Sequence, residues 1–429
     1  MSIWSQILFF TIVFLVLFGL QFLVFRTFRN FIKTNFSGSK ILKFISIYPF
    51  IIFNLPLVYV LLFRRSAGDI PPLLYDLIFL PFYIFQGATI FIGLYLLIGK
   101  IIKTPFLLGY WILNKFKAVK QSFKNFFSKP KVKKFDNSRR IFLRTSAGLV
   151  SSYAFIGSTF GVLGSNDFDV SKIDIKIDNL PEELKGTTIS LFCDVHSGPY
   201  MKEDLMKEYV NAINELKSDI ICIPGDLTNS VQAEAIPFAK AFRDLKASKG
   251  IFASLGNHDY FSNAEYISQV ISNETPIQLL RNNSEIIQIN GKNLCIMGSE
   301  DTRQSNAAPD SVLMGYLDKT VEVARQKLIE KNLNYDEVTK IALFHKPYFL
   351  EMMKDKDLQL VLSGHTHGGQ VVLANFGNVN ISFAGAVSKY ISGLYQAGGT
   401  KMYISRGIGS VGLPIRMNCP PEITKITLI

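Results

Sequence analysis

The stretch LSGHTHGGQ, residues 362–370, places two of the chain's five histidines, His365 and His367, on one glycine-flanked turn directly after an apolar run. Histidine beside glycine at the end of a strand is typical of a ligand-binding turn, because glycine allows tight turns and close approach of the backbone. If this turn binds a metal ion, other apolar runs of the chain should end in partner ligands.

Such partners follow several other predicted strands. From about residue 165, short apolar runs alternate with helix-like stretches such as 202–218 and 232–248. This alternation predicts an α/β layered domain, in which ligands bind where strands end. The runs at 187–196, 219–226, 250–259 and 340–347 end in the polar residues Asp194, His196, Asp226, Asn257, His258, Asp259 and His345. All five histidines therefore stand at predicted strand ends, a distribution that core or solvated histidines do not require.

The types of these residues favour transition metals. Imidazole and carboxylate suit Zn, Mn and Fe, whereas Ca and Mg take mainly oxygen ligands. Asp194 and His196 are two residues apart, so we expect their side chains on the same side of a strand end. Asp226 could bridge two ions roughly 3.5–4 Å apart, and Asn257 adds a neutral oxygen. The sequence predicts a site for two metal ions.

The blocks DVH, GDLTN, GNHD, FHKP and GHTHGG resemble, in this order, the five motifs of the calcineurin-like metallophosphoesterase superfamily. The resemblance covers roughly residues 185–429 and implies a four-layer α/β/β/α sandwich with a dinuclear site at the strand ends. The C-terminal stretch 403–428 is further similar to the membrane-associated, twin-arginine-exported bacterial branch of this superfamily.

The resemblance also implies a role for each candidate residue. The first metal would take Asp194, His196 and His367, the second Asn257, His345 and His365, and Asp226 would bridge them. His258 would contact the phosphate and assist the leaving group, and Asp259 would hydrogen-bond the His258 imidazole and set its tautomer.

One position departs from the family's pattern. Asn229 stands where the family usually has the last acid of its second block. We expect this change to tune metal binding rather than to abolish it.

Three arginines are candidate phosphate contacts: Arg303, Arg406 and Arg416. A structural role is favoured for each of them, and only Arg406 is kept as a substrate candidate.

The reaction that the resemblance implies is hydrolysis of a phosphate ester, a diester or a monoester, by a metal-activated hydroxide, with two Mn, Fe or Zn ions as cofactors. A non-catalytic scaffold of the same fold and a regulatory membrane protein are the alternatives. Scaffold relatives usually lose ligands, whereas here every ligand position is filled. A transporter or sensor is disfavoured because the first three predicted spans contain no charged residue.

Four apolar stretches lie in the first part of the chain: 3–25, 44–63, 77–99 and 145–166. The first three predict membrane spans over residues 1–99. The fourth, 145–166, is rich in small residues and is compatible with a span, a signal-type segment or a buried helix. The remaining residues, 167–429, form the predicted metallophosphoesterase domain.

The formal charge of +12 is unevenly distributed. Residues 100–144 carry thirteen Lys and Arg against one acid, whereas residues 145–429 carry 26 Lys and Arg against 31 acids. Because the domain itself is acidic, we expect no specific nucleic-acid partner. The basic segment 100–144 reads as a cytoplasmic linker, which predicts a multi-pass protein of the inner cell membrane with its domain outside the cytoplasm. Arg64 and Arg65, in the loop between the second and third spans, oppose this orientation.

Within the basic segment, SRRIFLR at 138–144 resembles a twin-arginine export signal, so the export machinery is a candidate partner beside the lipid bilayer and the phosphate-ester substrate. An ordinary basic flank before a span explains the motif equally well. A location near lipid suggests a phospholipid, a lipid-linked sugar phosphate or an envelope polymer as substrate, and soluble phosphodiesters and nucleotides stay open. Cys193, Cys222 and Cys295 are predicted core residues, and without a CxxC pair no cysteine zinc site is expected.

Overall fold

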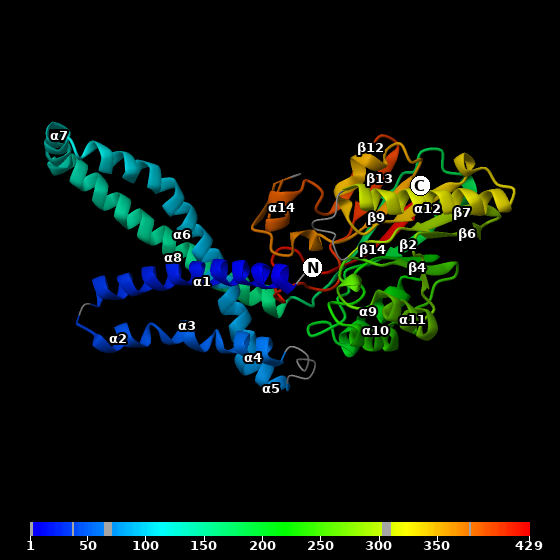
Figure 1. The fold of residues 1–429 in the computed structure, drawn as a ribbon, viewed down its shortest axis with the longest axis horizontal. Coiled ribbons are helices and arrows are strands. Elements are labelled where there is room, and N and C mark those ends of the chain that lie inside the picture. The colour runs from blue at the N-terminus through cyan, green and yellow to red at the C-terminus, as the bar shows by residue number, and fades with distance from the viewer. Residues whose placement is uncertain (1–2, 37, 64–70, 303–309, 377–378) are drawn as a thin grey trace. The chain divides into compact units, whose positions relative to one another are not determined.

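The structure is a computed structural model that describes residues 3–36, 38–63, 71–302, 310–376 and 379–429. The chain divides into two compact units, Met1–Val162 and Leu163–Ile429 (Figure 1).

The first unit is helical. Its described elements are α1 (Ile3–Asn35), α2 (Lys40–Ile45), α3 (Tyr48–Ile52), α4 (Leu55–Phe63), α5 (Pro72–Leu74), the π-helical turn η2 (Tyr75–Phe79), α6 (Leu80–Leu113), α7 (Lys117–Ser128) and α8 (Pro130–Leu163). Among the described residues, four stretches are long and apolar enough to cross a membrane: Thr11–Asn35, Lys40–Tyr59, Tyr75–Leu113 and Pro130–Leu163. They overlap the four apolar stretches of the sequence, so the chain has N-terminal helices that could span a membrane.

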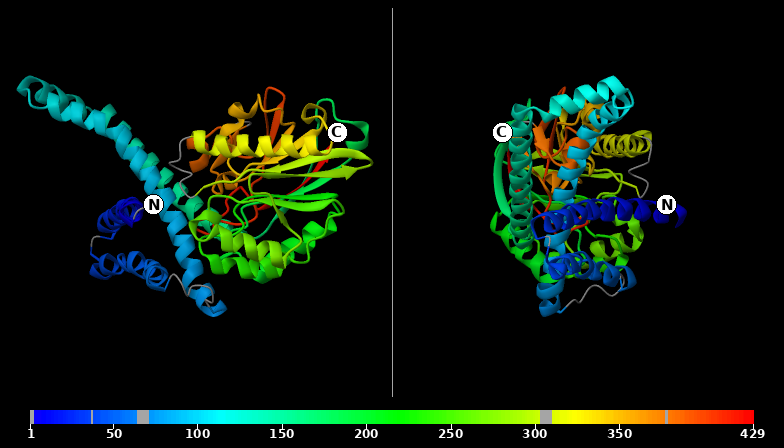
Figure 2. Two further views of the ribbon diagram at one scale, coloured as in Figure 1. Left: turned by 45° about the vertical axis from the view of Figure 1, so that its right-hand side comes forward. Right: turned by 90° about the vertical axis from the view of Figure 1, so that its left-hand side faces the viewer.

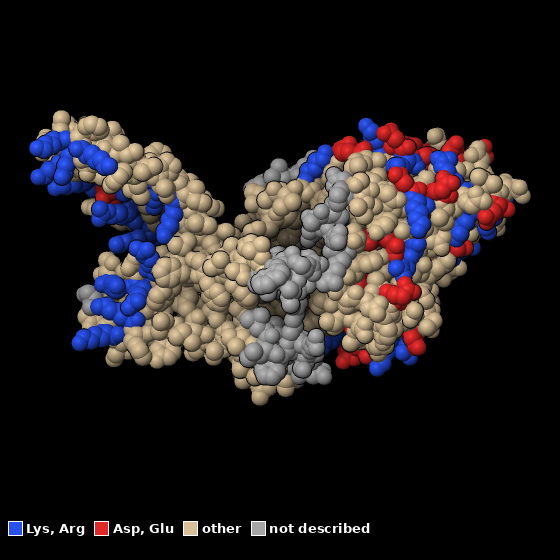
Figure 3. All heavy atoms as spheres, in the orientation of Figure 1, with Lys and Arg blue, Asp and Glu red and all other residues tan. Residues whose placement is uncertain are grey.

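The basic segment 100–144 is helical throughout most of its length. It forms the end of α6, the whole of α7 and the beginning of α8. Figure 3 shows Lys and Arg side chains gathered over this part of the unit, at the upper left of the view. Residues Arg64 and Arg65 lie outside the described residues.

The second unit is built on two six-stranded sheets among the described residues. The first has the order β1-β14-β2-β3-β4-β5, with β1 (Asp169–Ile175), β14 (Glu422–Leu428), β2 (Thr188–Leu191), β3 (Ile220–Pro224), β4 (Gly250–Ser254) and β5 (Gln278–Leu279). The second has the order β12-β13-β9-β8-β7-β6, with β12 (Gly393–Ala397), β13 (Thr400–Ile404), β9 (Leu360–Ser363), β8 (Thr339–Leu343), β7 (Lys292–Gly298) and β6 (Asn283–Ile289). A separate hairpin joins β10 (Ala374–Phe376) to β11 (Val379–Ile381).

Helices cover the outer face of each sheet, and Figure 2 shows the two sheets edge-on. On the first sheet α9 (Glu203–Glu215), α10 (Ala235–Phe242) and α11 (Ala264–Glu274) bury a core around Phe238 and Ile223. On the second sheet α12 (Asp310–Glu330) and α13 (Leu350–Met353) bury a core around Leu317 and Met402. A third core, between the two sheets, includes Leu343. The predicted four-layer α/β/β/α sandwich is therefore confirmed.

The central parallel strands are buried on both faces. The run IICIP of β3 is buried at every position, and so is TKIAL of β8. Such strands are stable only when layers cover both sides of the sheet. In the first sheet β2, β3 and β4 are mutually parallel, and in the second sheet β7, β8, β9 and β13 are. Their carboxyl ends therefore lie at one edge of each sheet.

Short helices connect these elements. They are η3 (Glu182–Leu184), η4 (Gln232–Glu234), η5 (Asp259–Phe261), η6 (Tyr335–Glu337), η7 (Pro347–Phe349), η8 (His367–Gly369) and α14 (Phe383–Val387). All four cysteines are buried free thiols, as predicted for Cys193, Cys222 and Cys295.

Candidate metal centre

The seven predicted metal ligands come together at the strand ends. Two follow β2, one each follows β3, β4 and β8, and two follow β9. Six of them are almost fully buried: Asp194, His196, Asp226, Asn257, His345 and His367. His365 is the more accessible member of the set. The packing of two sheets thus concentrates nitrogen and oxygen donors from five separate segments.

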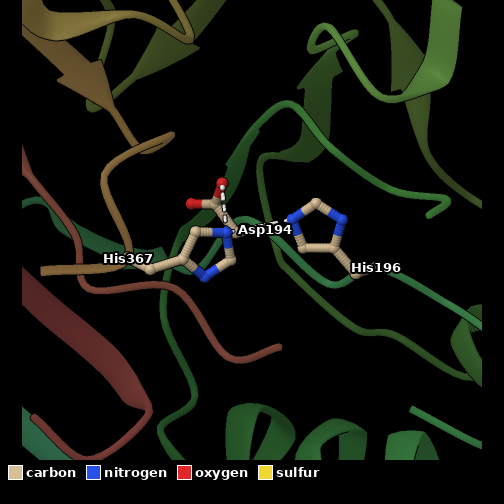
Figure 4. A group of neighbouring side chains, drawn as sticks. All are labelled: Asp194, His196 and His367. Carbon is tan, nitrogen blue, oxygen red and sulfur yellow. Dashed lines mark hydrogen bonds and ion pairs between the residues drawn. The ribbon is translucent and has the colours of Figure 1, made fainter. Parts of the chain in front are cut away.

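Asp194, His196 and His367 form the first group of donors. Nε2 of His196 lies 3.1 Å from Nε2 of His367, which in turn lies 3.7 Å from Oδ1 of Asp194. One ligand atom from each residue lies within 4.8 Å of the others. Figure 4 shows dashed lines from one nitrogen of the His367 ring to the Asp194 carboxylate and to the His196 ring.

Asp226, His345 and His365 form the second group. Oδ2 of Asp226 lies 3.1 Å from Nε2 of His345, and that nitrogen lies 3.3 Å from Nδ1 of His365. The same Oδ2 lies 3.7 Å from Nε2 of His196, a member of the first group. The Asp226 carboxylate therefore reaches both groups, as a bridging ligand must.

A buried atom without a partner tests whether metal ions fit this arrangement. Oδ1 of Asn257 is buried and accepts no hydrogen bond from any described residue. An unsatisfied buried acceptor costs about 1–3 kcal/mol, so this oxygen calls for a ligand. Together the imidazole, carboxylate and amide donors fit a pair of transition-metal ions.

Main-chain carbonyls orient two of the imidazoles. Nδ1 of His345 lies 2.8 Å from the carbonyl oxygen of Pro224, and Nδ1 of His367 lies 3.3 Å from that of Gly409. A hydrogen bond from Nδ1 leaves Nε2 to act as the ligand atom, which is how proteins usually fix a metal-binding histidine.

The backbone is strained at the candidate ligands. Five of them have positive φ angles: Asp194 at 51°, His196 at 49°, Asp226 at 54°, His365 at 72° and His367 at 50°. The side chains of Asp194 and His196 lie together as expected, but strand alternation is not the reason, because β2 ends at Leu191 and both residues lie in the following loop. A non-glycine residue in this region costs about 1–3 kcal/mol and is typical of functional sites.

Two glycines leave room for the carboxylates. A Cβ atom at Gly256 would lie 2.3 Å from Oδ1 of Asp226, and one at Gly364 would lie 2.3 Å from Oδ2 of Asp194. Both positions therefore exclude any side chain while the carboxylates keep their places.

Burial and charge set the protonation of the site without metal. Burial lowers the pKa of His196 and of His365 well below the usual value, and lowers the pKa of His367 to about 4. Burial also opposes the charge on His345, but the Asp226 carboxylate outweighs it and raises the pKa of His345 to about 10. Burial acts to raise the pKa of Asp226. The positive charge of the His345 imidazolium more than offsets this effect, and the pKa of Asp226 stays well below its usual range. The site thus holds three neutral imidazoles and one ion pair.

His258 lies beside the first group with its ring held from behind. Its Nδ1 lies 2.6 Å from the carbonyl oxygen of Asn229, and its main-chain N–H donates to Oδ1 of Asp226 at 2.8 Å. Its ring packs edge-on against His196 with centroids 4.5 Å apart. This contact leaves Nε2 of His258 as the nitrogen that can serve a substrate.

Asp259 does not hydrogen-bond the His258 imidazole, so that prediction is wrong. Its carboxylate accepts the main-chain N–H groups of Leu227, Thr228 and Gly256 at 2.8–3.2 Å, and also the Thr228 hydroxyl at 3.0 Å. Burial, with a smaller contribution from Asp226, raises the pKa of Asp259 to about 6. Asp259 ties the loops after β3 and β4 together.

At position 229, where the family usually has an acid, the main chain rather than the side chain contacts His258. The Asn229 side chain donates to the Ser230 hydroxyl, whereas the Asn229 carbonyl oxygen holds His258. Glu234, which sequence reasoning missed, fixes this loop: its Oε2 accepts the N–H groups of Asn229, Ser230 and Val231 at 2.6–3.0 Å. A glutamate three residues after the start of the helical stretch was the available signal.

Two of the three candidate arginines make structural contacts, the role that the sequence favours for them. Arg406 forms ion pairs with Asp169 at 3.2 Å and Glu422 at 3.3 Å, which neutralise its guanidinium and give it a structural role. Arg416 is buried and donates to the carbonyl oxygens of Arg406, Gly407 and Cys419, so it supports the loop behind His367. Arg303 lies outside the described residues.

Further residues around the site were missed. Nζ of Lys346, the residue after His345, is buried 3.8 Å from Oδ1 of Asp301 and has no hydrogen-bond partner in the described part of the chain. Two partly exposed aromatic rings flank the histidines: Phe261 lies 4.4 Å from His258 and Tyr348 lies 5.6 Å from His365 between centroids. The sequence signal for Phe261 and Tyr348 was their short spacing from the histidines of the motifs.

Comparison with known proteins finds phosphoesterases in each case. Residues 187–369 match the calcineurin-like phosphoesterase family. An uncharacterized metallophosphoesterase of Bacillus subtilis is 28% identical over 300 residues, which cover 68% of this chain and 97% of that protein. A second one, of Aquifex aeolicus, is 30% identical over 261 residues, covering 60% of this chain and 91% of that protein. A transmembrane protein with a metallophosphoesterase domain from Danio rerio is 28% identical over 267 residues, covering 60% of this chain and 57% of that protein.

Proposed function

The chain belongs to the calcineurin-like phosphoesterase family, and on this premise we propose that it is a metal-dependent phosphate-ester hydrolase tethered to a membrane by its own helices. The observation that carries the proposal is the position of Asp226, whose Oδ2 lies 3.1 Å from the His345 nitrogen and 3.7 Å from the His196 nitrogen. One carboxylate between two groups of buried imidazoles is the arrangement that a two-metal site requires.

The residues divide into two binding sets. Asp194, His196 and His367 would hold the first ion, Asn257, His345 and His365 would hold the second, and Asp226 would contact both. These donors favour Mn, Fe or Zn. When bound, such ions would lower the pKa of water to about 7 and neutralise charge on phosphoryl oxygens.

The chain's own groups would position the substrate and move a proton. Because Nδ1 of His258 is held by the Asn229 carbonyl oxygen, Nε2 is the atom that would contact a phosphoryl oxygen and pass a proton to the departing oxygen. The His258 main-chain N–H binds Asp226 and so ties this imidazole to the bridging carboxylate.

We place the domain outside the cytoplasm of a multi-pass protein in the inner cell membrane. Relatives from Danio rerio and Bos taurus are named as transmembrane proteins, and thirteen Lys and Arg between the third and fourth apolar stretches favour a cytoplasmic position for residues 100–144. In this arrangement residues 145–166 form the fourth span. The motif SRRIFLR lies inside α8, where Arg139 and Arg140 each pair with Asp136 at 2.7 Å, so a basic flank of this span accounts for it and export by the twin-arginine machinery is the alternative.

The test is hydrolysis by the purified full chain loaded with Mn, Fe or Zn, assayed on a chromogenic phosphomonoester and a chromogenic phosphodiester. We expect Asp226→Ala to lose activity at least about a thousandfold, because metal ions supply several kcal/mol of transition-state stabilisation. We expect His258→Ala to lose roughly a hundredfold or more, as for a general acid.

Asp204→Ala, at an exposed position of α9, is the matched control and should keep full activity. Equal activity of Asp226→Ala and the parent protein would refute the site. A protein that binds metal but hydrolyses neither substrate would instead favour the non-catalytic scaffold.

A further inference from the structure

The segment that follows the GHTHGGQ turn is free of charge. Residues 371–388 contain no Asp, Glu, Lys or Arg. Four of its large apolar side chains are exposed: Leu373 by 43%, Ile381 by 43%, Phe383 by 62% and Val387 by 84%. We call these four residues the apolar lobe.

Exposure of this set is unfavourable in water. Burying apolar surface stabilises by about 25 cal/mol per Å², and contiguous exposed apolar residues mark contact sites for membranes or proteins. Phe383 and Val387 are four residues apart in α14, so they lie on one face of that helix turn. Elsewhere in the described second unit, exposed large apolar residues stand singly or, as Tyr348 and Met352, in a pair.

The apolar lobe is attached to the turn that carries His367. Nδ2 of Asn380 donates to the carbonyl oxygen of Gly368 at 3.4 Å. A Cβ atom at Gly369 would lie 2.4 Å from Oγ of Ser382, so the two segments are in close contact. A surface that binds the lobe therefore lies beside the candidate metal centre.

The lobe also lies near the point where the chain enters the second unit. A Cβ atom at Gly368 would lie 2.7 Å from Cγ of Arg406, and the Arg406 guanidinium pairs with Asp169, the first residue of β1. Only residues 164–168 separate β1 from the end of α8, and this connection can reach at most about 20 Å. If α8 spans a bilayer, the lipid surface is within reach of the entry point.

We propose that the apolar lobe inserts into the surface of the lipid bilayer that α8 crosses, so that the metal centre acts on phosphate esters presented at that surface. The proposal deepens the proposed function, on whose membrane tether it rests, by naming amphiphilic phosphate esters as the substrate class. Absence of charge over residues 371–388 removes the desolvation cost that charged side chains would add. A bilayer needs no ionic complement, whereas a protein partner would find none on the lobe.

The test measures lipid contact directly. The full chain is reconstituted into phosphatidylcholine vesicles with Phe383→Cys labelled by an environment-sensitive fluorophore, which is selective because all four native cysteines are buried. Ile329→Cys on α12, 65% exposed, is the matched control position. Nitroxide groups on the lipid acyl chains should reduce emission from position 383 by about half or more, because interfacial apolar groups lie roughly 5–10 Å below the headgroups. Emission from position 329 should stay unchanged.

Equal emission changes at the two positions would overturn the proposal. A blue shift that grows with protein concentration and is insensitive to the nitroxide lipids would also overturn it, in favour of an interface between copies. Val387→Cys provides a second lobe position if the first variant fails to fold. Hydrolysis of a soluble chromogenic phosphoester, measured on the same vesicles with Mn, separates the two proposals: quenching without hydrolysis contradicts only the hydrolase, and hydrolysis without quenching contradicts only the lobe.

Discussion

At the scale of single residues, the site depends on groups that are forced into place. Asp194, Asp226 and His367 are held at positive φ angles, and glycines 256 and 364 leave space for the two carboxylates. The identity of the seven candidate ligands could be predicted, because each follows an apolar strand. Their backbone conformations could not, since a left-handed turn depends on packing between loops from different strands.

Gly256→Ala should reduce the metal affinity of the protein. Its Cβ atom would lie 2.3 Å from Oδ1 and 2.5 Å from the main-chain nitrogen of Asp226, so we expect Asp226 to move with its loop and metal affinity to fall by about 10–100-fold, the range for disturbed support of metal ligands. Metal content after dialysis checks this. Gly315→Ala in α12 is the control: a Cβ there meets nothing within 4 Å, and the substitution should stabilise the protein by up to about 1 kcal/mol. Equal metal content in both variants would contradict the role of Gly256.

Metal affinity should rise with pH. In the metal-free site the pKa of His345 is about 10, while burial keeps His196, His365 and His367 neutral at pH 7. A metal ion must displace the proton from Nε2 of His345, so about one proton is released on binding and affinity should increase about tenfold per pH unit from pH 7 until it levels near that pKa. Metal titration by calorimetry in buffers of different ionisation enthalpy checks the count. Affinity that is constant between pH 7 and 9 would contradict the ion pair of His345 with Asp226.

At the scale of elements, the contacts of the site that the sequence motifs do not predict are made by loops rather than by strands. The Asn229 carbonyl oxygen, not its side chain, holds His258, and Glu234 at the end of η4 holds the Asn229 loop. Asp259 serves main-chain N–H groups of two loops instead of an imidazole. The sequence could predict Asn229, His258 and Asp259 as participants but not their pairings, because main-chain partners leave little signal in residue identity. Glu234 was missed, although its position at the start of a helical stretch was a signal for its contacts.

Glu234→Ala should disturb His258 without touching it. The substitution removes the acceptor of three main-chain N–H groups, and we expect a loss of about 1.5–3 kcal/mol in the free energy of unfolding. Turnover should fall by about tenfold or more as His258 loses its fixed partner, with metal content retained. Asn229→Asp should change turnover by no more than about twofold, because the hydrogen bond of its side chain goes to Ser230 and not to His258. A larger effect of Asn229→Asp than of Glu234→Ala would show that the side chain at 229 acts directly. Chemical denaturation and steady-state kinetics provide both readouts.

At the scale of the whole molecule, composition could predict the two kinds of structure in the chain, apolar helices and an acidic α/β domain. The helical state of residues 100–144 was not anticipated, because lysine-rich composition suggested a linker while the segment continues α6, forms α7 and begins α8. Lysine and arginine have good helix propensity. A composition rich in them is nevertheless compatible with both a solvated helix and a loop.

The position of the domain can be tested with a reporter fused after Ile429. Thirteen Lys and Arg precede the fourth apolar stretch, so we expect the fused reporter to lie outside the cytoplasm. A reporter enzyme that works only outside the cytoplasm should therefore show activity. Replacing Lys129, Lys131, Lys133 and Lys134 by Gln should lower that activity, whereas replacing Lys202, Lys207, Lys217 and Lys240 by Gln in the domain should not. Activity of a cytoplasm-specific reporter at this site would reverse the orientation.

The central claim is that Asp226 joins two metal ions, and anomalous X-ray scattering from crystals of the Mn-loaded protein tests it most directly. We predict two peaks roughly 3.5–4 Å apart, one among Asp194, His196 and His367 and the other among Asn257, His345 and His365, with the Asp226 carboxylate between them. A single peak, or two peaks that Asp226 does not contact, would contradict the account.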